Sequence, residues 1–501
     1  MISFCKPDVQ SNIVSMVHVG AIGGALVATK LIDFFGRVRS LQIICIVYLV
    51  GVIVQMTSKN LGQLYAGRFV EGLSVGCTTT AGPVYLVEAA PSVIRGVVGA
   101  IFSAPIYLGV MIEYFANYGV VLDVPSLTRS KQPNDLQWIY TLIPKVIIPS
   151  LMFIFSFVFC IESPRWLVKT GKIEKAVRNL SHLRKLPQNH PYVIAELSDI
   201  NDQVETEKQA TSGYNMWRCV KEICTKKSIA YRFFAIAALA QILGQWSGAN
   251  AITLYAAQLF SLAGVAGAAG KLKMMAILGV VKFVVAYFAA FFLIDIVGRK
   301  KTLYIGLGVQ IVSVLYYAIF LTVVPQAANK GADGTFTPSQ ARASKAAIAS
   351  IFFNAIGWVI GWNNTQYLIG SEIFPLHIRS FAQSAVMVVH FANMYGNAKA
   401  LPKMMIAMHP YGAFYFFAGV MVLGMIWSFL LPELKGRNLE AVEEVFTLPW
   451  YKLRHGDVLV QDHSQVNKLT HGDSKCGDSE SENMELSKET LDGVRVSEKS
   501  V

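Results

Sequence analysis

Long apolar segments recur along most of this chain, and they limit its fold more than any other feature of the sequence. Each is close to the length of about 20 residues that a helix needs to cross the apolar core of a bilayer. The eleven segments lie near residues 11–32, 41–57, 64–89, 97–121, 138–161, 233–262, 273–296, 302–324, 345–371, 381–408 and 411–431. Buried helices of a soluble protein can mimic one or two such segments, but not eleven. The sequence therefore predicts an all-α, polytopic membrane protein.

The composition supports this class and excludes others. Only 15% of the 501 residues are charged, against about a quarter in soluble domains. The net charge of +12 does not indicate nucleic-acid binding, because the basic residues sit in short clusters between apolar segments, as in cytoplasmic loops. The seven cysteines are scattered and form neither a metal-binding spacing nor a disulfide framework. The sequence shows no nucleophile triad, phosphate-binding glycine loop or metal cluster, so it indicates no enzyme and no cofactor.

The basic clusters also set the expected orientation. They lie at Arg37, Arg95, 165–232, Arg299 and Arg379. When successive segments alternate in direction, these loops fall on one side of the membrane, which the positive-inside rule assigns to the cytoplasm. Within the polar stretch 162–232, Gly171–Arg184 is expected to form an amphipathic helix. After about residue 456 the chain has the composition of a disordered tail.

A short signature occurs twice and divides the chain into two related halves. Leu31–Arg37 and Leu293–Arg299 both read Leu-Ile-Asp-x-x-Gly-Arg, and in each half a later Glu is followed by an Arg after seven residues. In the second half the segment 233–262 precedes the one that carries the signature. Its counterpart in the first half would lie before Met1, so we expect about eleven of twelve helices. The expected units are bundles at 1–161 and 233–431, a cytoplasmic linker at 162–232 and a cytoplasmic tail at 432–501.

Five blocks of sequence carry a family resemblance. They are Asp33–Arg37 with Asp295–Lys301, Gly67–Gly96, Glu162–Leu167, Gln245–Ala251 and Pro432–Glu440. In this order they resemble the sugar porter branch of the major facilitator superfamily over roughly residues 11–448. Gly361–Pro375 looks most like fungal members, including quinate-permease-like ones. The resemblance implies that a monomer in the plasma membrane moves a sugar, polyol or quinate-like cyclic hydroxy acid by alternating access, with proton coupling left open.

Charged residues cluster at the cytoplasmic ends of the predicted helices. In the first half they are Asp33, Arg37, Glu88, Arg95, Glu162 and Arg165, and in the second half Asp295, Arg299, Glu372, Arg379 and Glu433. Ionic contacts of this kind can hold helices together in one state and release them in the next. We therefore interpret these residues as the cytoplasmic gate of a rocking transporter. The alternative is that they only anchor helix ends at the membrane interface.

Uncharged polar side chains at mid-membrane depth are the candidates for binding a hydroxylated solute, because amides both donate and accept hydrogen bonds. By the resemblance, Gln245 and Asn250 are sugar-binding positions, and Asn393 matches another. Trp362 and Gln366 are added because an offset of four places them on one helical face. Any one of these amides can instead join two helices.

Several family positions carry a different residue here. Ser103 stands where the family has a Gln on its fifth helix, Gly244 replaces the first Gln of a pair, and His390 replaces a Trp. Leu254 replaces an aromatic residue of the seventh helix. These departures argue against ordinary hexose specificity, and Ser103 is kept as a candidate substrate contact.

Three of the charges inside apolar segments are candidates for a role in transport. Lys282 is about 20 Å from the cytoplasmic end of its segment, where an unpaired charge costs at least roughly 3 kcal/mol. It either snorkels or pairs with an acid such as Glu113, or it binds an anionic substrate. Arg68 matches an Arg that in proton-coupled relatives pairs with an acid of the first helix. Glu71, three residues on, is its candidate partner here, and the two are the coupling candidates.

Two other classes of function stay open from the sequence. A transport-inactive protein of the same fold, either a truncated product or a membrane sensor, would suit the absent segment and the altered positions. An integral-membrane enzyme would need acids, histidines or cysteines clustered at one depth, and the sequence shows no such cluster.

Overall fold

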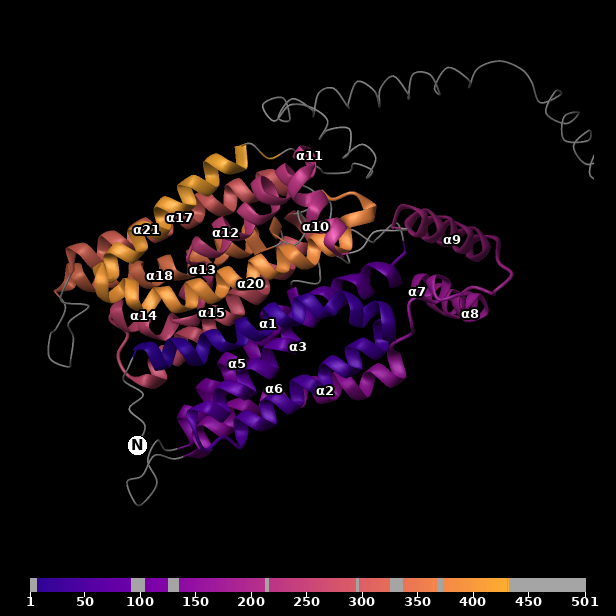
Figure 1. Ribbon diagram of the computed structural model, residues 1–501. Coiled ribbons are helices and arrows are strands. Elements are labelled where there is room, and N and C mark those ends of the chain that lie inside the picture. The colour runs from indigo at the N-terminus through magenta and orange to yellow at the C-terminus, as the bar shows by residue number, and fades with distance from the viewer. Residues whose placement is uncertain are drawn as a thin grey trace, which may run out of the picture.

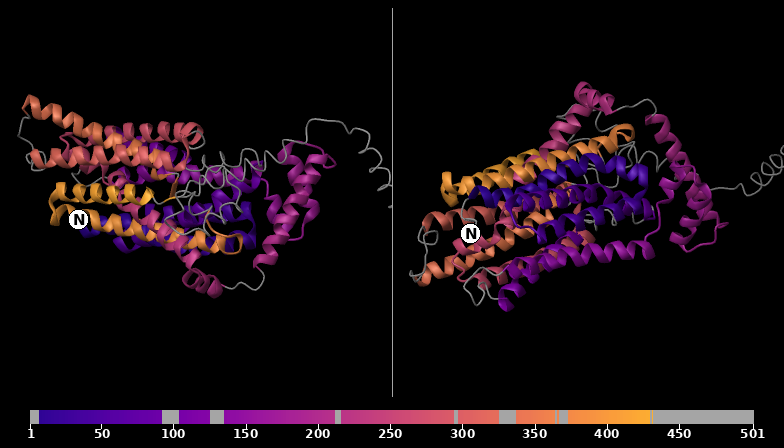
Figure 2. Two further views of the ribbon diagram at one scale, coloured as in Figure 1. Left: turned by 90° about the horizontal axis from the view of Figure 1, so that it is seen from above. Right: turned by 60° about the horizontal axis from the view of Figure 1, so that its bottom comes forward.

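The computed structural model describes residues 7–91, 104–124, 135–211, 216–293, 297–324, 337–363, 365–366, 373–429 and 431. Within these ranges every regular element is a helix. The long helices run side by side, with those of the first half of the chain together and those of the second half beside them (Figure 1). A smaller group of helices, α7 to α9, lies at one end of this assembly (Figures 1 and 2).

The first half contains five long helices. They are α1 (Pro7–Phe35), α2 (Arg37–Met56), α3 (Leu61–Ala89), α5 (Ala104–Asp123) and α6 (Asp135–Phe159). These helices agree with the first five apolar segments predicted from the sequence. The predicted start of the fourth segment, near residue 97, lies outside the described residues.

The second half begins with a helix that is broken into pieces. They are α11 (Lys227–Ala230), the π-helical η2 (Tyr231–Ala238), α12 (Leu239–Trp246), α13 (Ala249–Leu254) and α14 (Ala256–Leu262). The single segment predicted over 233–262 is therefore interrupted. One interruption falls at Gly248, whose φ of 81° lies in the left-handed region that favours glycine.

The remaining helices of the second half are longer. They are α15 (Ala268–Phe288) with the π-helical η3 (Ala289–Leu293), α17 (Arg299–Val323), α18 (Pro338–Ile360), α20 (Leu376–Ala407) and α21 (His409–Phe429). The segment predicted over 345–371 is interrupted at Gly361: residues 362–363 and 365–366 are helical again, and the predicted end near 371 lies outside the described residues. The helix ends at Ile360 because Gly361 leaves the helical conformation, with φ −86° and ψ −85°.

Nine of the helices in the described residues are long and apolar enough to cross a membrane. Two others, α3 with 29 residues and α20 with 32 residues, are long enough but more polar. Both lie within the same assembly of parallel helices (Figure 1). The described helices therefore account for all eleven predicted segments, and the fold is that of a multi-pass membrane protein.

The helices of the two halves pack according to one plan. α2 packs against α3 and α6, just as α17 packs against α18 and α21. A Cβ added to Gly67 of α3 would lie 2.9 Å from the carbonyl oxygen of Gly51 in α2. A Cβ added to Gly357 of α18 would lie 2.7 Å from the carbonyl oxygen of Gly306 in α17. The same glycine-to-glycine crossing is thus built twice, as the repeated signature predicts.

The two halves contact each other along two seams. α1 packs against α20, and α15 packs against α5. The pseudo-symmetry that pairs α2 with α17 also pairs α1 with α15 and α5 with α20, so the two seams are equivalent. The α1–α20 seam carries an ion pair of 3.2 Å between Asp8 and Lys403 and a hydrogen bond of 2.6 Å between the Thr29 and Ser384 hydroxyls.

Helices α1 and α3 approach more closely than any side chain would permit. A Cβ on Gly20, Gly24, Gly72 or Gly76 would lie 2.1 Å from a backbone oxygen of the facing helix. Gly20 and Gly24 are four residues apart on α1, and Gly72 and Gly76 are four apart on α3. Small residues at this spacing are the usual way for membrane helices to bring their backbones together.

The linker between the halves forms shorter helices at one end of the long helices (Figure 1). They are α7 (Pro164–Lys169), α8 (Ile173–Arg184), α9 (Pro191–Thr211) and α10 (Met216–Thr225). The amphipathic helix predicted over Gly171–Arg184 is confirmed by α8. Arg184 joins this group to α3 by donating to the Ala89 carbonyl at 3.1 Å. Its hydrogen bonds to Glu196 raise the pKa of the Arg184 guanidinium.

Candidate functional site

The break between α12 and α13 places two candidate amides on either side of a bend. Gln245 precedes Gly248, and Asn250 follows it. A Cβ on Gly248 would lie 2.5 Å from the ring of Phe417 in α21, so both the conformation and the space require glycine. Broken helices at membrane depth occur where the backbone is buried in protein or lines a cavity. The bend is therefore a plausible centre for a binding site.

Gln245 is the hub of a buried polar network that joins three helices. Its Nε2 donates to Oε1 of Gln366 at 3.1 Å. Gln241, one turn earlier on α12, donates from Nε2 to the backbone oxygen of Gln366 at 3.1 Å. The four side chains that meet here, Gln241, Gln245, Gln366 and His390, are at most 4% exposed. The predicted candidates Gln245 and Gln366 are therefore brought together.

The hydrogen bonds assign the proton on His390. Its Nδ1 lies 2.8 Å from Oε1 of Gln241. Because the Gln241 amide nitrogen already donates to a backbone oxygen, its Oε1 is the acceptor and the His390 Nδ1 carries the hydrogen. The approach of Gln245 Nε2 to the same Nδ1 at 3.3 Å then brings two donors together and is not a hydrogen bond. The His that replaces a family Trp thus serves to position Gln241.

The replacement at Gly244 has a steric explanation. A Cβ at this position would lie 3.0 Å from the Gln366 carboxamide and 3.3 Å from the Trp362 ring. Without a side chain at residue 244, Gln366 can approach α12 and bond to Gln245. Trp362 fills the space between Gly244 and α21 and stacks on Trp427, with ring centroids 5.9 Å apart. Its ring therefore lies inside the second-half bundle.

Several buried polar atoms near the bend have no hydrogen-bond partner. They are Oε1 of Gln245, Nδ2 of Asn250, Oδ1 of Asn397 and Nε1 of Trp362. Leaving a buried donor or acceptor unpaired costs about 1–3 kcal/mol. An arrangement that keeps both donors and acceptors unpaired suits a ligand that has hydroxyl groups. Asn393 differs from these residues because both of its amide atoms have partners. Its Oδ1 accepts from Trp246 Nε1 at 3.0 Å, which joins α20 to α12, and its Nδ2 donates to the Val389 carbonyl of the same helix at 2.8 Å.

Lys282 lies where the two halves meet, and it is 3% exposed. Its ammonium donates to the Thr253 hydroxyl of α13 and lies 5.8 Å from the ring centroid of Tyr107 in α5. None of the ion pairs formed by the described residues includes Lys282. Glu113, the acid suggested as its partner, is instead 3.5 Å from Lys145. Thr253 is three residues after Asn250, so the two share a face of α13.

Glu71 is the centre of a second buried network, within the first half. The carboxylate is 3.3 Å from the Lys145 ammonium and 3.9 Å from Arg68. It also accepts from Gln55 Nε2 at 3.0 Å and from the Tyr48 hydroxyl at 3.2 Å. The predicted partners Arg68 and Glu71 are therefore close, but Lys145 of α6 is the nearer cation. Lys145 in turn connects Glu71, which is 4% exposed, to the half-exposed Glu113.

Four of the predicted gate residues of the first half, Asp33, Arg37, Glu88 and Glu162, form one cluster. Arg37 donates to both oxygens of Glu88, each at 2.7 Å. Glu162 accepts from the backbone nitrogen of Arg37 at 2.7 Å, so its charge lies at the N-terminus of α2, where the helix dipole favours an anion. Asp33 lies 3.6 Å from Arg37. Arg165 is separate, since it pairs with Glu207 of α9 at 3.0 Å.

The signature glycine explains how Glu162 reaches the backbone of α2. Gly36 has a φ of 91°, and a Cβ there would lie 2.7 Å from a Glu162 oxygen. Gly298, the equivalent residue of the second signature, also has a φ of 91°. In the second half Arg379 donates to the Phe374 carbonyl from Nε at 3.1 Å and from a terminal nitrogen at 2.9 Å.

Some predicted site residues lie outside the described residues. They are Ser103, Arg95, Asp295, Glu372 and Glu433, together with the side chain of Arg299. Four relevant residues were not predicted: Gln241, Thr253, Asn397 and Lys145. Lys145 had a clear signal, a cation inside an apolar segment, and Gln241 is four residues before Gln245 on the same face. Thr253 and Asn397 gave no signal that separates them from other polar residues in helices.

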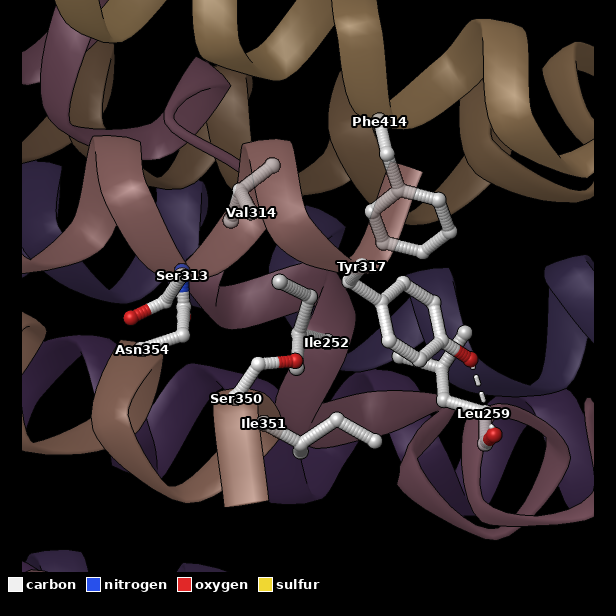
Figure 3. Close-up of a pocket in the computed structure, with 9 residues that line it drawn as sticks. All are labelled: Ile252, Leu259, Ser313, Val314, Tyr317, Ser350, Ile351, Asn354 and Phe414. Atoms are coloured by element: carbon white, nitrogen blue, oxygen red, sulfur yellow. Dashed lines mark hydrogen bonds between the residues drawn. The ribbon is translucent and has the colours of Figure 1, made fainter. Parts of the chain in front are cut away.

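A small pocket lies inside the second-half bundle. Figure 3 shows Ser313 and Tyr317 of α17 facing Ser350 and Asn354 of α18 across it. Both amide atoms of Asn354 lack a partner, but apolar side chains make up most of the pocket lining. Ile252 of α13 lines this pocket, and the next residue, Thr253, accepts a hydrogen bond from Lys282. The helix that carries the candidate site therefore also borders a small, mostly apolar pocket, at a place that the sequence did not predict.

A model of the sugar (and other) transporter family matches residues 6–446 of the chain. The chain belongs to this family. Among curated relatives of this transporter, a probable quinate permease of Aspergillus niger is 34% identical over 469 residues, which cover 91% of this chain and 82% of that protein. The quinate permease of Emericella nidulans is 30% identical over 449 residues, covering 87% and 80%.

Solved structures show the same fold. The proton:xylose symporter XylE bound to 6-bromo-6-deoxy-D-glucose matches the transporter with a TM-score of 0.69 at 21% identity, over 88% of this chain and 89% of that chain. A partially occluded, inward-open form of XylE from E. coli matches with a TM-score of 0.67 over 86% and 89%. The predicted two-bundle helical fold is therefore confirmed. Because the family and its permeases are transporters, transport rather than catalysis is confirmed as well, and the transport-inactive alternative is not favoured.

Proposed function

We propose that this transporter carries a cyclic hydroxylated carboxylate of the quinate type by alternating access. The observation that carries the proposal is Lys282, a cation buried between the two halves with no carboxylate partner among the described residues. A charge at this depth is costly unless it faces a partner or a cavity. An anionic substrate would supply the partner. The relatives named quinate permeases support this substrate class.

The hydroxyl groups of such a substrate suit the polar atoms near the bend. Oε1 of Gln245 can accept a hydrogen bond from a ring hydroxyl, and Nδ2 of Asn250 can donate one. Asn250 shares a face of α13 with Thr253, which holds the Lys282 ammonium. We therefore assign carboxylate binding to Lys282 and hydroxyl binding to Gln245 and Asn250. Gln366 is assigned the positioning of Gln245.

Alternating access needs two halves that move as units around this site. Tyr107 belongs to the first half and Lys282 to the second, so a substrate at Lys282 would lie on the boundary between them. The cluster of Asp33, Arg37, Glu88 and Glu162 ties α1, α2, α3 and the start of α7 together. We propose that this cluster belongs to the cytoplasmic gate. The proposal also assigns the transporter to the plasma membrane as a monomer, with bundles at 1–161 and 233–431.

Uptake by proteoliposomes tests the substrate class directly. We expect the full chain to accumulate labelled quinate and to show counterflow of it, because the carboxylate pairs with Lys282. The neutral amide of quinic acid and an uncharged cyclitol keep the hydroxyl groups without the charge, and we expect both to compete poorly with quinate. Equal competition by quinate and its amide would contradict the assignment of Lys282 and favour a neutral sugar or polyol as substrate.

We further propose that a proton accompanies the substrate and that Glu71 binds it. Arg68, Glu71, Glu113 and Lys145 carry two positive and two negative charges, which balance when all are ionised. A proton on a carboxylate of this network adds one positive charge, and the substrate carboxylate at Lys282 adds one negative charge. Co-transport of a proton and a carboxylate would therefore add no net charge to the membrane-buried part of the transporter.

The variant Glu71→Gln separates coupling from binding. The amide is nearly the same size, and its oxygen can still accept from Gln55 Nε2 while its nitrogen donates to the Tyr48 hydroxyl, but it binds no proton. We expect gradient-driven accumulation of quinate to fall at least about tenfold while counterflow, which needs no net proton movement, persists. Glu174→Gln on the exposed face of α8 is the matched control. Normal accumulation by Glu71→Gln under a proton gradient would contradict the proposal.

A further inference from the structure

Helix α10 (Met216–Thr225) has one buried face that fixes it to the second-half bundle. Cys219, Glu222 and Ile223 are each at most 7% exposed. The helix packs against α11 and against α20 at its cytoplasmic end. Glu222 accepts from the Lys226 ammonium at 2.5 Å. The position of α10 is therefore set by packing rather than left to a free loop.

The other face of α10 exposes apolar side chains. Trp217 is 81% exposed and Val220 is 38% exposed, and Cys224 is exposed beside them. Their offsets of three and four place them in one stripe along the helix. An indole this exposed in a segment outside the membrane spans loses the burial that usually stabilises a Trp. The stripe therefore lacks a partner within the described part of the chain.

Basic side chains border this stripe. Arg218, Lys221, Lys226 and Lys227 are all exposed, and Glu222, the acid of the helix, is on the buried face. The outer surface of α10 therefore presents apolar groups flanked by positive charge. This is the pattern of a helix that lies in the headgroup layer of a membrane with its apolar stripe toward the acyl chains.

The place of α10 in the fold fits that pattern. The membrane span Lys227–Trp246 begins two residues after α10 ends. In Figure 1, α10 lies beside α11 at the same end of the assembly as α7 to α9. Both views of Figure 2 show it projecting sideways beyond the long helices at that end. By the positive-inside assignment this is the cytoplasmic end, where anionic lipids give the leaflet a negative surface.

We propose that α10 lies in the cytoplasmic headgroup layer and binds anionic phospholipid. Trp217 and Val220 insert toward the acyl chains, and Arg218 and Lys221 contact the phosphate and carboxylate groups of the lipid. The charge pattern and the direct continuity with a membrane span favour a lipid surface over a protein partner. The proposal does not depend on which solute the transporter carries.

Quenching of Trp217 emission tests this placement. The full-length chain and its Trp217→Phe variant are reconstituted in phosphatidylcholine vesicles, and the difference between their spectra gives the emission of Trp217. We expect brominated phospholipids to quench that emission and aqueous iodide to leave most of it. Quenching by iodide but not by brominated lipid would overturn the proposal, because the indole would then face water.

The same difference spectrum measures the preference for anionic lipid. We expect brominated phosphatidylserine to quench Trp217 at a lower mole fraction than brominated phosphatidylcholine does. Arg218→Gln and Lys221→Gln should each weaken this preference about fivefold, the factor that corresponds to one basic residue near an anionic surface. Lys175→Gln and Lys208→Gln, on exposed positions of α8 and α9, are the matched controls. Equal quenching by the two lipids in the unaltered chain would also overturn the proposal.

Discussion

Replacing Gly24 with alanine is expected to remove most of the folded transporter. The added Cβ would lie 2.1 Å from the Leu73 carbonyl oxygen and 2.9 Å from the Leu73 carbonyl carbon, both backbone atoms of α3. A rotamer change cannot relieve a clash with backbone, so α1 and α3 must separate. Separation also loosens the neighbouring contacts at Gly20 and Gly76. Overpacking costs about 1–3 kcal/mol even where side chains can adjust, and here we expect about 3 kcal/mol or more.

Two other glycines provide controls for Gly24→Ala. Gly119 of α5 has no atom within 4 Å of an added Cβ, so Gly119→Ala should be neutral or stabilising. Gly23, adjacent to Gly24, would meet only the flexible end of Leu73 at 3.1 Å. The measurement is the monodisperse fraction after detergent extraction, together with the melting temperature of that fraction. If Gly24→Ala behaves like Gly119→Ala, the backbone contact between α1 and α3 is not as close as described.

The helices were predictable because membrane insertion requires long apolar segments, and the sequence keeps them separate. The repeated Leu-Ile-Asp-x-x-Gly-Arg signature also predicted that the halves share a plan, and Gly36 and Gly298 confirm it with equal φ angles of 91°. The interruptions of the segment 233–262 were not predictable from hydrophobicity. Hydrophobicity does not say where a helix bends, and it is the packing against Phe417 that shows the bend at Gly248.

Within the site, residue types were easier to predict than partners. Amides at membrane depth pointed to Gln245 and Gln366, but their contact joins residues 121 positions apart. It depends on Gly244, which the sequence showed only as a departure from the family pattern. Likewise Glu113 was one of several acids that could have met Lys282, and only the fold shows that it meets Lys145 instead. The function of these residues in transport stays a prediction.

The largest functional effect is expected from Lys282→Gln. If the ammonium binds the substrate carboxylate, its removal leaves a buried anion without a counter-charge, which costs about 2–5 kcal/mol. We expect the KM for quinate to rise about 30-fold or more. Uptake of the neutral amide of quinic acid should improve, because binding of this amide no longer leaves a buried ammonium group without a counter-charge. The selectivity between the two solutes should therefore invert. The ratio of the initial rates at which proteoliposomes take up quinate and its amide measures this selectivity.

Two further substitutions separate a charge effect from a structural one. Lys282→Arg keeps the positive charge and should retain more quinate uptake than Lys282→Gln, although the larger guanidinium must displace Thr253 or Tyr107 from their present contacts. Lys273→Gln removes a charge from the exposed surface of the same helix and should leave both solutes unaffected. A general loss of uptake in Lys282→Gln, with the ratio of quinate to amide unchanged, would mean that the lysine supports the fold. Only inversion of that ratio, absent from Lys273→Gln and reduced in Lys282→Arg, identifies Lys282 as the residue that recognises the carboxylate.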